Sequence, residues 1–310
     1  MAKLLTNDFI NEKIVNKYES KMKTAFKLTG LQKSFNEFQL GPIDLELEPG
    51  MVMGYIGPNG SGKTTTMHCM VGLIKPDAGE VEIFGKQNNP NNVDWKLDFG
   101  YVGDKHVFYE NWDTEKNLNF IKQFYPNWDN QFADELIKRF ELPLNKKAKE
   151  LSTGNRVKLS LVQALSHRPK LLILDEPTAG LDPVVRTELL DILFEIVESG
   201  ERAIFYSTHI LSDISRIADE LTFIKNGKLV LSTQKDELTE NWRTISFKLH
   251  QEKKEFKNIE MIEVEGNNYK LISNNFNSTI DELKSLGAEN ISETRMSVDE
   301  IAVQILKRNR

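Results

Sequence analysis

Apolar and polar residues alternate along the first part of the chain with the two-residue period of a β-strand. Phe26 and Leu28 have polar neighbours, and residues 43–47 alternate again before the Pro-Gly turn pair at 49–50. Residues 51–56 form an apolar run typical of a buried strand, and residues 79–84 predict another short strand. We therefore expect a strand-rich region over residues 23–84.

Helical patterns and apolar runs alternate over the middle of the chain. Residues 95–165 predict mostly helix, apart from a strand at 99–102. Apolar strands at 171–174 and 203–206 are each followed by a helical stretch, and Asn226-Gly227 predicts a hairpin. Such alternation is typical of a largely parallel sheet with helices around it.

The two ends of the chain depart from this pattern. Residues 1–22 are polar, with apolar residues at near-helical spacing, which predicts a short helix that caps the domain or frays. Beyond about residue 240 strand-like alternation is followed by two helical stretches, the second beginning with a capping box at 297–300. We expect three parts: an N-terminal extension at 1–22, a main domain at 23–239 with a helical subdomain at about 95–165, and an α+β appendage at 240–310.

Composition and charge exclude several classes of protein. The 310 residues are 39% hydrophobic and 28% charged, as in ordinary globular proteins. The single cysteine excludes an intrachain disulfide, and the net charge of −6 disfavours general nucleic-acid binding. No apolar run approaches the roughly 18 residues that span a bilayer, and the first residues lack a signal-peptide core. We expect a soluble protein whose membrane-spanning partner, where it has one, is another chain.

A glycine-rich loop directly after the strand at 51–56 carries the strongest chemical signal. Residues 57–64, GPNGSGKT, match G-x-x-x-x-G-K-[ST] and precede a helix-compatible run. Glycines let backbone N–H groups turn toward an anion, and the helix N-terminus favours negative charge. Lys63 is then expected to reach the β- and γ-phosphates and Thr64 to hold Mg²⁺. The alternative is a glycine-rich turn with an incidental lysine, which the flanking strand and helix disfavour.

Two carboxylates end the apolar strand at 171–174. Acidic residues at the carboxyl end of a buried parallel strand lie where ligands bind in α/β sheets. Asp175 is suited to the Mg²⁺ shell and Glu176 to polarising an attacking water. The alternative is an acidic strand end that merely starts the turn before Pro177.

His209 ends the next strand, and we expect it to reach the γ-phosphate. The other histidines show no metal-ligand spacing and are assigned no role: His68, His106, His167 and His250.

Taken in order, these motifs resemble the ATP-binding subunit of an ABC (ATP-binding cassette) transporter over roughly residues 24–235. LSTGN at 151–155 occupies the place of the family's LSGGQ signature, which implies that Ser152 and Gly154 contact the γ-phosphate bound by a second protomer. AGLD at 179–182 resembles the D-loop, which implies that Asp182 lies at the dimer interface. His209 matches the family's switch histidine.

Four positions are less regular. Phe35 falls where the family stacks an aromatic ring on adenine, although a core aromatic at a strand end is the alternative. Thr153 and Asn155 replace a glycine and a glutamine of the signature, which weakens the expected contact across the dimer. Asp104 replaces the Q-loop glutamine; it is expected to touch the Mg²⁺–water shell, but it is shorter and charged, which implies a differently tuned coupling to the partner.

The resemblance implies an α/β P-loop NTPase of ABC type, with a mixed or parallel sheet core, an antiparallel β edge and a helical subdomain, plus the small α+β appendage. ATP and Mg²⁺ are the implied cofactors. The implied catalytic residues are Lys63, Glu176 and His209, and the implied Mg²⁺ ligands are Thr64, Asp175 and Asp104. The expected ATP contacts are Phe35, Gly57, Pro58, Asn59, Gly60, Ser61, Gly62, Lys63, Thr64, Thr65, Asp104, Ser152, Gly154 and Asp182.

The implied function is ATP hydrolysis that powers export by a separate membrane subunit, through ATP-dependent head-to-tail dimerisation. The dimer partner is a second copy or a homologous subunit, the location is the cytoplasmic face of the cell membrane, and no nucleic acid is bound. FYPNWD at 124–129 resembles the bacterial ABC-2 exporter-like subgroup. Residues 95–140 are rich in aromatics, and the membrane partner is expected to dock against the helical subdomain near residues 99–128, with core packing as the alternative reading of the aromatics.

Two other functions stay open at this point. One is an ABC-type ATPase that drives a soluble assembly complex and has no membrane partner; a stable soluble partner would distinguish it. The other is an inactive homologue, which is disfavoured because every motif position that carries the chemistry is filled.

Overall fold

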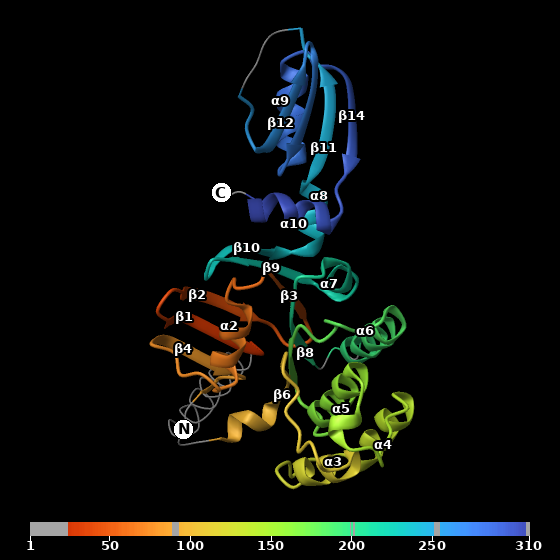
Figure 1. Ribbon diagram of the computed structural model, residues 1–310. Coiled ribbons are helices and arrows are strands. Elements are labelled where there is room, and N and C mark those ends of the chain that lie inside the picture. Colours follow the sequence, from red (N-terminus) through yellow and green to blue (C-terminus); the bar gives the residue numbers. More distant parts are fainter. Residues whose placement is uncertain (1–23, 89–92, 199, 201, 251–254, 308–310) are drawn as a thin grey trace, which may run out of the picture.

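The computed structural model describes residues 24–88, 93–198, 200, 202–250 and 255–307, which form three sheets and the helices around them (Figure 1). The N-terminal extension expected at 1–22 lies outside the described residues. Among the described residues, none of the helices combines the length and the apolar character that crossing a membrane requires.

A six-stranded sheet lies at the centre, in the order β10-β9-β3-β8-β7-β6. Five strands run parallel, and the edge strand β10 pairs antiparallel with β9 across Asn226-Gly227. The prediction of a largely parallel sheet is therefore confirmed. The strands are β3 (Val52–Ile56), β6 (Phe99–Val102), β7 (Leu171–Asp175), β8 (Ala203–Thr208), β9 (Glu220–Lys225) and β10 (Lys228–Gln234).

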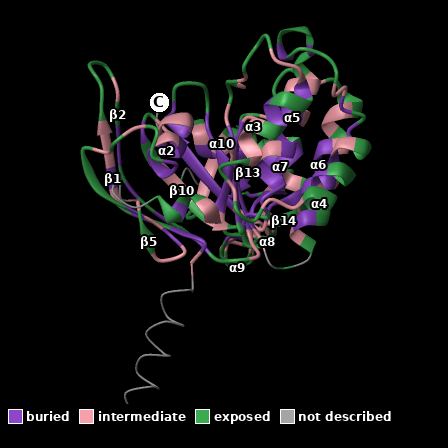
Figure 2. Ribbon diagram, turned by 90° about the horizontal axis from the view of Figure 1, so that it is seen from below, coloured by how far each residue is buried: buried purple, intermediate pink, exposed green. Residues whose placement is uncertain are grey.

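Both faces of this sheet are covered, which explains why its strands are apolar runs without alternation. In β3, Val52 and Ile56 join one core, to which α5 (Thr153–Leu165), α6 (Pro183–Glu198) and α7 (Leu211–Ile217) also contribute. Met53 and Tyr55 join the other core, with residues of α2 (Lys63–Met70). Purple buried strands run through the middle of the molecule in Figure 2.

The antiparallel β edge predicted from the first part of the chain is a separate four-stranded sheet in the order β2-β1-β4-β5. It packs its apolar face onto the α2 side of the central sheet, where Phe26 contacts Phe205 of β8 at 4.9 Å between ring centroids. Its strands are β1 (Phe26–Ser34), β2 (Gln39–Leu47), β4 (Ala78–Ile83) and β5 (Lys86–Gln87).

The helical region contains α3 (Thr114–Lys122), α4 (Asn130–Arg139) and the long helix α5, with 3₁₀ turns at Asp94–Asp98 and Ala148–Glu150. Each of the three helices begins at a side-chain cap, from Asp113, Asp129 and Ser152 respectively. Such caps satisfy backbone N–H groups that have no partner in the first turn. β6, inside the predicted helical stretch, belongs to the central sheet, so the helical region projects from the sheet between β6 and β7.

The C-terminal region forms a third, antiparallel sheet in the order β12-β13-β11-β14, with α9 packed on it. Its apolar core includes Ile245, Phe247, Leu271 and Leu283. The elements are α8 (Lys235–Asn241), β11 (Arg243–Lys248), β12 (Ile259–Glu265), β13 (Asn268–Ser273), α9 (Phe276–Ser285), β14 (Glu289–Arg295) and α10 (Val298–Lys307).

The last helix does not pack with this small core. α10 lies against α7, β9 and β10 of the main domain, as Figure 1 also shows. Its buried residues Ile301, Ala302 and Ile305 belong to the same core as the central sheet. The capping box predicted at its start is present: the Ser297 hydroxyl accepts from the Glu300 N–H, and the Glu300 carboxylate accepts from the Ser297 N–H at 2.8 Å.

Candidate functional site

The phosphate loop joins β3 to α2 and curls around its own lysine. Gly62, at the N-cap of α2, has a φ of 111°, which a residue with a side chain rarely adopts. A Cβ at Gly57 would lie 2.3 Å from the Ile224 carbonyl oxygen, so only glycine fits there. Lys63 is 5% exposed, and its Nζ donates to the Gly57 carbonyl at 2.7 Å. The loop thus forms a closed turn whose ammonium group faces inward.

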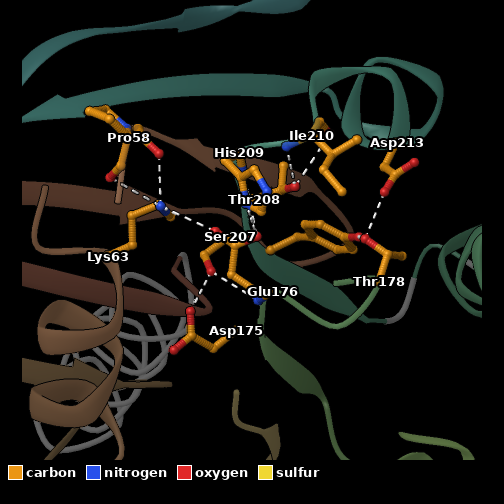
Figure 3. A network of polar contacts seen from close by, with 12 residues as sticks. Pro58, Lys63, Asp175, Glu176, Thr178, Ser207, Thr208, His209, Ile210 and Asp213 are labelled. Carbon is orange, nitrogen blue, oxygen red and sulfur yellow. Dashed lines mark hydrogen bonds and ion pairs between the residues drawn. The ribbon is translucent and has the colours of Figure 1, made fainter. Parts of the chain in front are cut away.

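Glu176 connects this lysine with the histidine that ends β8 (Figure 3). Its Oε1 lies 3.1 Å from Lys63 Nζ, and its Oε2 lies 2.7 Å from His209 Nδ1. Glu176 has a φ of 51°, an uncommon conformation for a residue with a Cβ. Such strain is concentrated at functional sites, and here it turns the carboxylate toward the phosphate loop.

Asp175 is the innermost acidic group of the site, with 0% of its surface exposed. Its Oδ1 accepts from the Ser207 hydroxyl at 2.5 Å, and it also interacts with the Thr64 hydroxyl. Its Oδ2 has no hydrogen-bond partner. Burial raises the pKa of Asp175 above its ordinary value, and the nearby charges of Asp104 and Glu176 raise it further. A buried carboxylate oxygen without a donor is costly, and a cation would satisfy it.

Asp104 follows the carboxyl end of β6, next to the strand that carries Asp175. A carboxylate oxygen of Asp104, one of Asp175 and a ring nitrogen of His68 lie within 4.8 Å of one another. Together with the Thr64 hydroxyl, the two carboxylates supply the hard oxygen ligands that Mg²⁺ prefers. The residues present therefore fit a divalent cation at this edge of the sheet.

Phe35 lies just beyond β1 and is 47% exposed. Its ring centroid is 6.5 Å from that of Phe38, and a Cβ on Gly62 would lie 3.0 Å from the Phe38 ring. The exposed ring therefore lies on the side of the phosphate loop, where a nucleobase could stack on it.

The signature residues and Asp182 form a second cluster. Ser152 caps α5 by accepting from the Asn155 N–H at 3.3 Å, and Asp182 caps α6 by accepting from the Val184 and Val185 N–H groups. A Cβ at Gly154 would lie 3.7 Å from Val185, so the capped N-terminus of α5 lies next to the capped N-terminus of α6. Within the described residues, no hydrogen bond or ion pair joins Ser152, Gly154 or Asp182 to the phosphate loop. Within one chain, the predicted ATP contacts thus form two groups.

The strand ends are held in place by a buried polar network that the sequence alone does not single out. Thr178 donates to Asp213 at 2.7 Å (Figure 3). It also shares a 3.0 Å hydrogen bond with the Tyr206 hydroxyl. Arg186 pairs with the same Asp213 carboxylate. Burial raises the pKa of Tyr206, so its hydroxyl stays neutral in this network. The network ties α6 and α7 to the turn that follows Glu176.

Ser207 and His68 are two site residues that the sequence patterns missed. Ser207 is the β8 residue that pairs with Asp175 of β7. Both residues stand at the carboxyl end of a predicted apolar strand, and this shared position could have indicated Ser207. His68 points toward the carboxylates from α2, one and a half turns beyond Lys63. No local spacing reveals this, because the three groups come from three separate segments.

Comparison with known proteins identifies relatives over most of the chain. The family model described as ABC transporter matches residues 40–179. The bacitracin transport ATP-binding protein BcrA of Bacillus licheniformis is 32% identical over 237 residues, which are 75% of this chain and 78% of that protein. The ABC transporter ATP-binding protein YtrB of Bacillus subtilis is 31% identical over 217 residues, 70% of this chain and 74% of its own.

Solved structures agree with these relatives. A structure described as the ATP binding subunit of an ABC transporter has a TM-score of 0.64 and 26% identity, covering 70% of this chain and 92% of its own. The dimeric structure of MJ0796, a bacterial ABC transporter cassette, has a TM-score of 0.61 at 23% identity, over 67% of this chain and 98% of its own. The second likeness is one of fold.

Proposed function

This chain belongs to the ATP-binding proteins of ABC transporters, and from that premise we propose how its described residues divide the work. As a member of the family it is an ATPase subunit, whose hydrolysis of ATP is coupled to transport by a separate membrane subunit. The observation that carries the rest of the proposal is the chain of contacts from Lys63 through Glu176 to His209.

The phosphate loop of residues 57–65 binds the phosphates of ATP, and Lys63 neutralises the β- and γ-phosphates. Lys63 exchanges its present contact with the Gly57 carbonyl for phosphate oxygens as the nucleotide enters. Glu176 orients and polarises the attacking water, and His209 holds the Glu176 carboxylate and contacts the γ-phosphate. Thr64, Asp175 and Asp104 would hold Mg²⁺, which would supply positive charge to neutralise the phosphates. Phe35 stacks on the adenine.

Ser152, Gly154 and Asp182 complete the site of a second protomer. The N-terminus of α5 presents backbone N–H groups and a small side chain, which suits a γ-phosphate. The two groups of predicted ATP contacts are separate within one chain, so a head-to-tail dimer is the arrangement that brings them to one nucleotide. The partner is a second copy or a homologous subunit.

The membrane subunit docks on a groove between β6 and the helical region. The groove has a volume of about 530 Å³ and is lined by Leu73, Val107, Phe108, Ile121 and Tyr125, among others. Val107 is 88% exposed. Beside it the Tyr109 ring stacks on Trp112 with centroids 4.2 Å apart. Exposed aromatic and apolar groups next to a groove are typical of docking surfaces.

We assign the protein to the cytoplasmic side of the cell membrane and the transport direction to export. The export direction is supported by the resemblance of the 124–129 segment to the ABC-2 exporter-like subgroup. We propose a division into an N-terminal extension at 1–22, a main domain at 23–239 and an appendage at 240–310, the last helix of which, α10, packs on the main domain.

The experiment that tests the partner is purification of a tagged copy from detergent-solubilised native membranes. A multi-span membrane protein is expected to co-purify in stoichiometric amount. Val107→Asp is expected to abolish this, whereas Val264→Asp, an equally drastic change at an exposed position of β12, is expected to leave it intact. A stoichiometric soluble partner with nothing from the membrane would contradict the docking proposal and favour the assembly ATPase.

A further inference from the structure

His68 lies near the cation-binding edge, and the proposed ATP chemistry does not use it. It lies in the last turn of α2 and is half-buried. Its ring packs edge-on against Tyr101 of β6, with 6.3 Å between centroids. The ring thus lies against the strand that leads to Asp104.

Three different segments bring ligand atoms to one point here. A ring nitrogen of His68, a carboxylate oxygen of Asp104 and one of Asp175 all lie within 4.8 Å of one another. A metal ion bonded at about 2.1 Å to each ligand brings ligand atoms to about 4.2 Å or less from each other. The observed spacing is close to this value, and Asp104 is the exposed member of the three.

An independent observation supports a cation at this point. Asp175 is fully buried, and its Oδ2 has no hydrogen-bond partner, whereas its Oδ1 is bonded by Ser207. Native proteins rarely leave a buried carboxylate oxygen unsatisfied. No lysine or arginine forms an ion pair with Asp175 among the described residues.

The donor set distinguishes between cations. Mg²⁺ favours oxygen ligands and water, whereas imidazole nitrogen suits first-row transition metals. We propose that His68, Asp104 and Asp175 form a site for a divalent transition-metal ion, which binds to the free protein without nucleotide and more tightly than Mg²⁺.

The site shares Asp104 and Asp175 with the ATP site proposed above, but it requires no nucleotide and no dimer. An experiment can therefore contradict the proposed metal site and leave the proposed ATPase function intact, or the reverse. A transition-metal ion held here in advance would be available to the phosphates when ATP binds, in place of Mg²⁺ from solution.

The test is Mn²⁺ binding to the full chain without ATP, followed by electron paramagnetic resonance. One Mn²⁺ per chain is expected, with an electron spin-echo modulation from a directly bonded nitrogen. His68→Leu and His68→Gln are expected to lose the nitrogen signal and to weaken Mn²⁺ binding at least about 10-fold. A tenfold excess of Mg²⁺ is expected to displace little Mn²⁺ from the wild type.

His250→Asn is the matched control, because His250 lies in the C-terminal region with its side chain 66% exposed. It is expected to retain both the affinity and the nitrogen signal. Equal Mn²⁺ affinity in wild type and both His68 variants, or a nitrogen signal that persists in them, would overturn the site. Absence of Mn²⁺ binding to the wild type would overturn it too, and normal ATP turnover in the same preparation would leave the ATPase assignment intact.

Discussion

The phosphate edge of the central sheet and the C-terminal region are built in opposite ways. At the phosphate edge, polar groups from α2, β7 and β8 are buried together, and the 0% exposed Asp175 lies among them. In the C-terminal region the buried groups are mostly apolar, and the polar residues of β12 and β14 face solvent. Burying polar groups costs free energy, and at the phosphate edge the buried polar groups are those that bind the ligand. The C-terminal region is instead stabilised by the packing of apolar side chains.

The same contrast appears in how each region is attached. The phosphate edge is fixed by short contacts such as Lys63–Glu176 and Glu176–His209. The C-terminal region is linked to the main domain by apolar packing: the buried face of the amphipathic helix α10 joins the central core, together with Trp242, Ile272 and Met296. Removing one charge should therefore stop chemistry without unfolding the protein, and removing one methyl-rich side chain from α10 should do the reverse.

The largest expected effect is that of Glu176→Gln. Glutamine keeps the size and one carbonyl oxygen but cannot polarise water as a carboxylate does, so ATP turnover is expected to fall about 10²- to 10⁴-fold. The measurement is phosphate release from the purified chain, with Glu265→Gln, an exposed change at the end of β12, as the control. Turnover near the wild-type rate in Glu176→Gln would show that this residue takes no part in the chemistry. It would also contradict the contrast drawn between the phosphate edge and the C-terminal region.

The next effect concerns the anchor of the C-terminal region. Ile305 is 0% exposed, so Ile305→Ala is expected to lower the free energy of unfolding by about 2–5 kcal/mol in a urea titration. Val303 is 46% exposed on the same helix, and Val303→Ala is expected to change it by less than about 0.5 kcal/mol. Equal losses in both variants would show that α10 does not rest on the core as described.

A smaller effect, which depends on pH, concerns the capping box at the start of α10. The Ser297 N–H and hydroxyl, both hydrogen-bonded to Glu300, hold the pKa of Glu300 below its ordinary value of 4.5. A carboxylate whose pKa is lower in the folded than in the unfolded protein stabilises the fold at pH values above its unfolded pKa. This stabilisation is lost as the pH falls through its folded pKa. The free energy of unfolding of the wild type is therefore expected to exceed that of Glu300→Gln by less than about 1 kcal/mol at pH 7. The gap should shrink as the pH falls below 4.5, and a gap that stays unchanged over that range would contradict the ionic part of the cap.

The sequence predicts the phosphate edge far better than the C-terminal region, for a physical reason. Phosphate binding needs particular residues at fixed local spacing, as in GPNGSGKT and in Asp175-Glu176 at a strand end. The pattern does not predict β14, because β14 is an exposed edge strand with almost no apolar alternation. It does not predict β13 either, whose apolar residues Tyr269, Leu271 and Ile272 alternate only over a few positions. The attachment of α10 to the main domain was missed as well, since an amphipathic pattern shows that a face is buried but not against what.

Contacts between distant segments account for the rest of what was missed. His68, Asp104 and Asp175 meet only because α2, the end of β6 and the end of β7 converge. Similarly, the network of Thr178, Tyr206 and Asp213 has no sequence spacing of its own. Motifs thus reveal residues that act through local backbone geometry, and the tertiary fold reveals their neighbours.

The central claim is that two chains share each ATP site, and the mass of Glu176→Gln by light scattering tests it most directly. With ATP the mass is expected to rise from 35.6 kDa to about twice that value, and without ATP to stay at that of one chain. Adding Gly154→Asp should prevent the rise, because a Cβ there meets only ordinary contacts within the chain but a carboxylate would face the phosphate. A mass that stays at one chain with ATP, or a dimer that forms despite Gly154→Asp, would contradict the shared site.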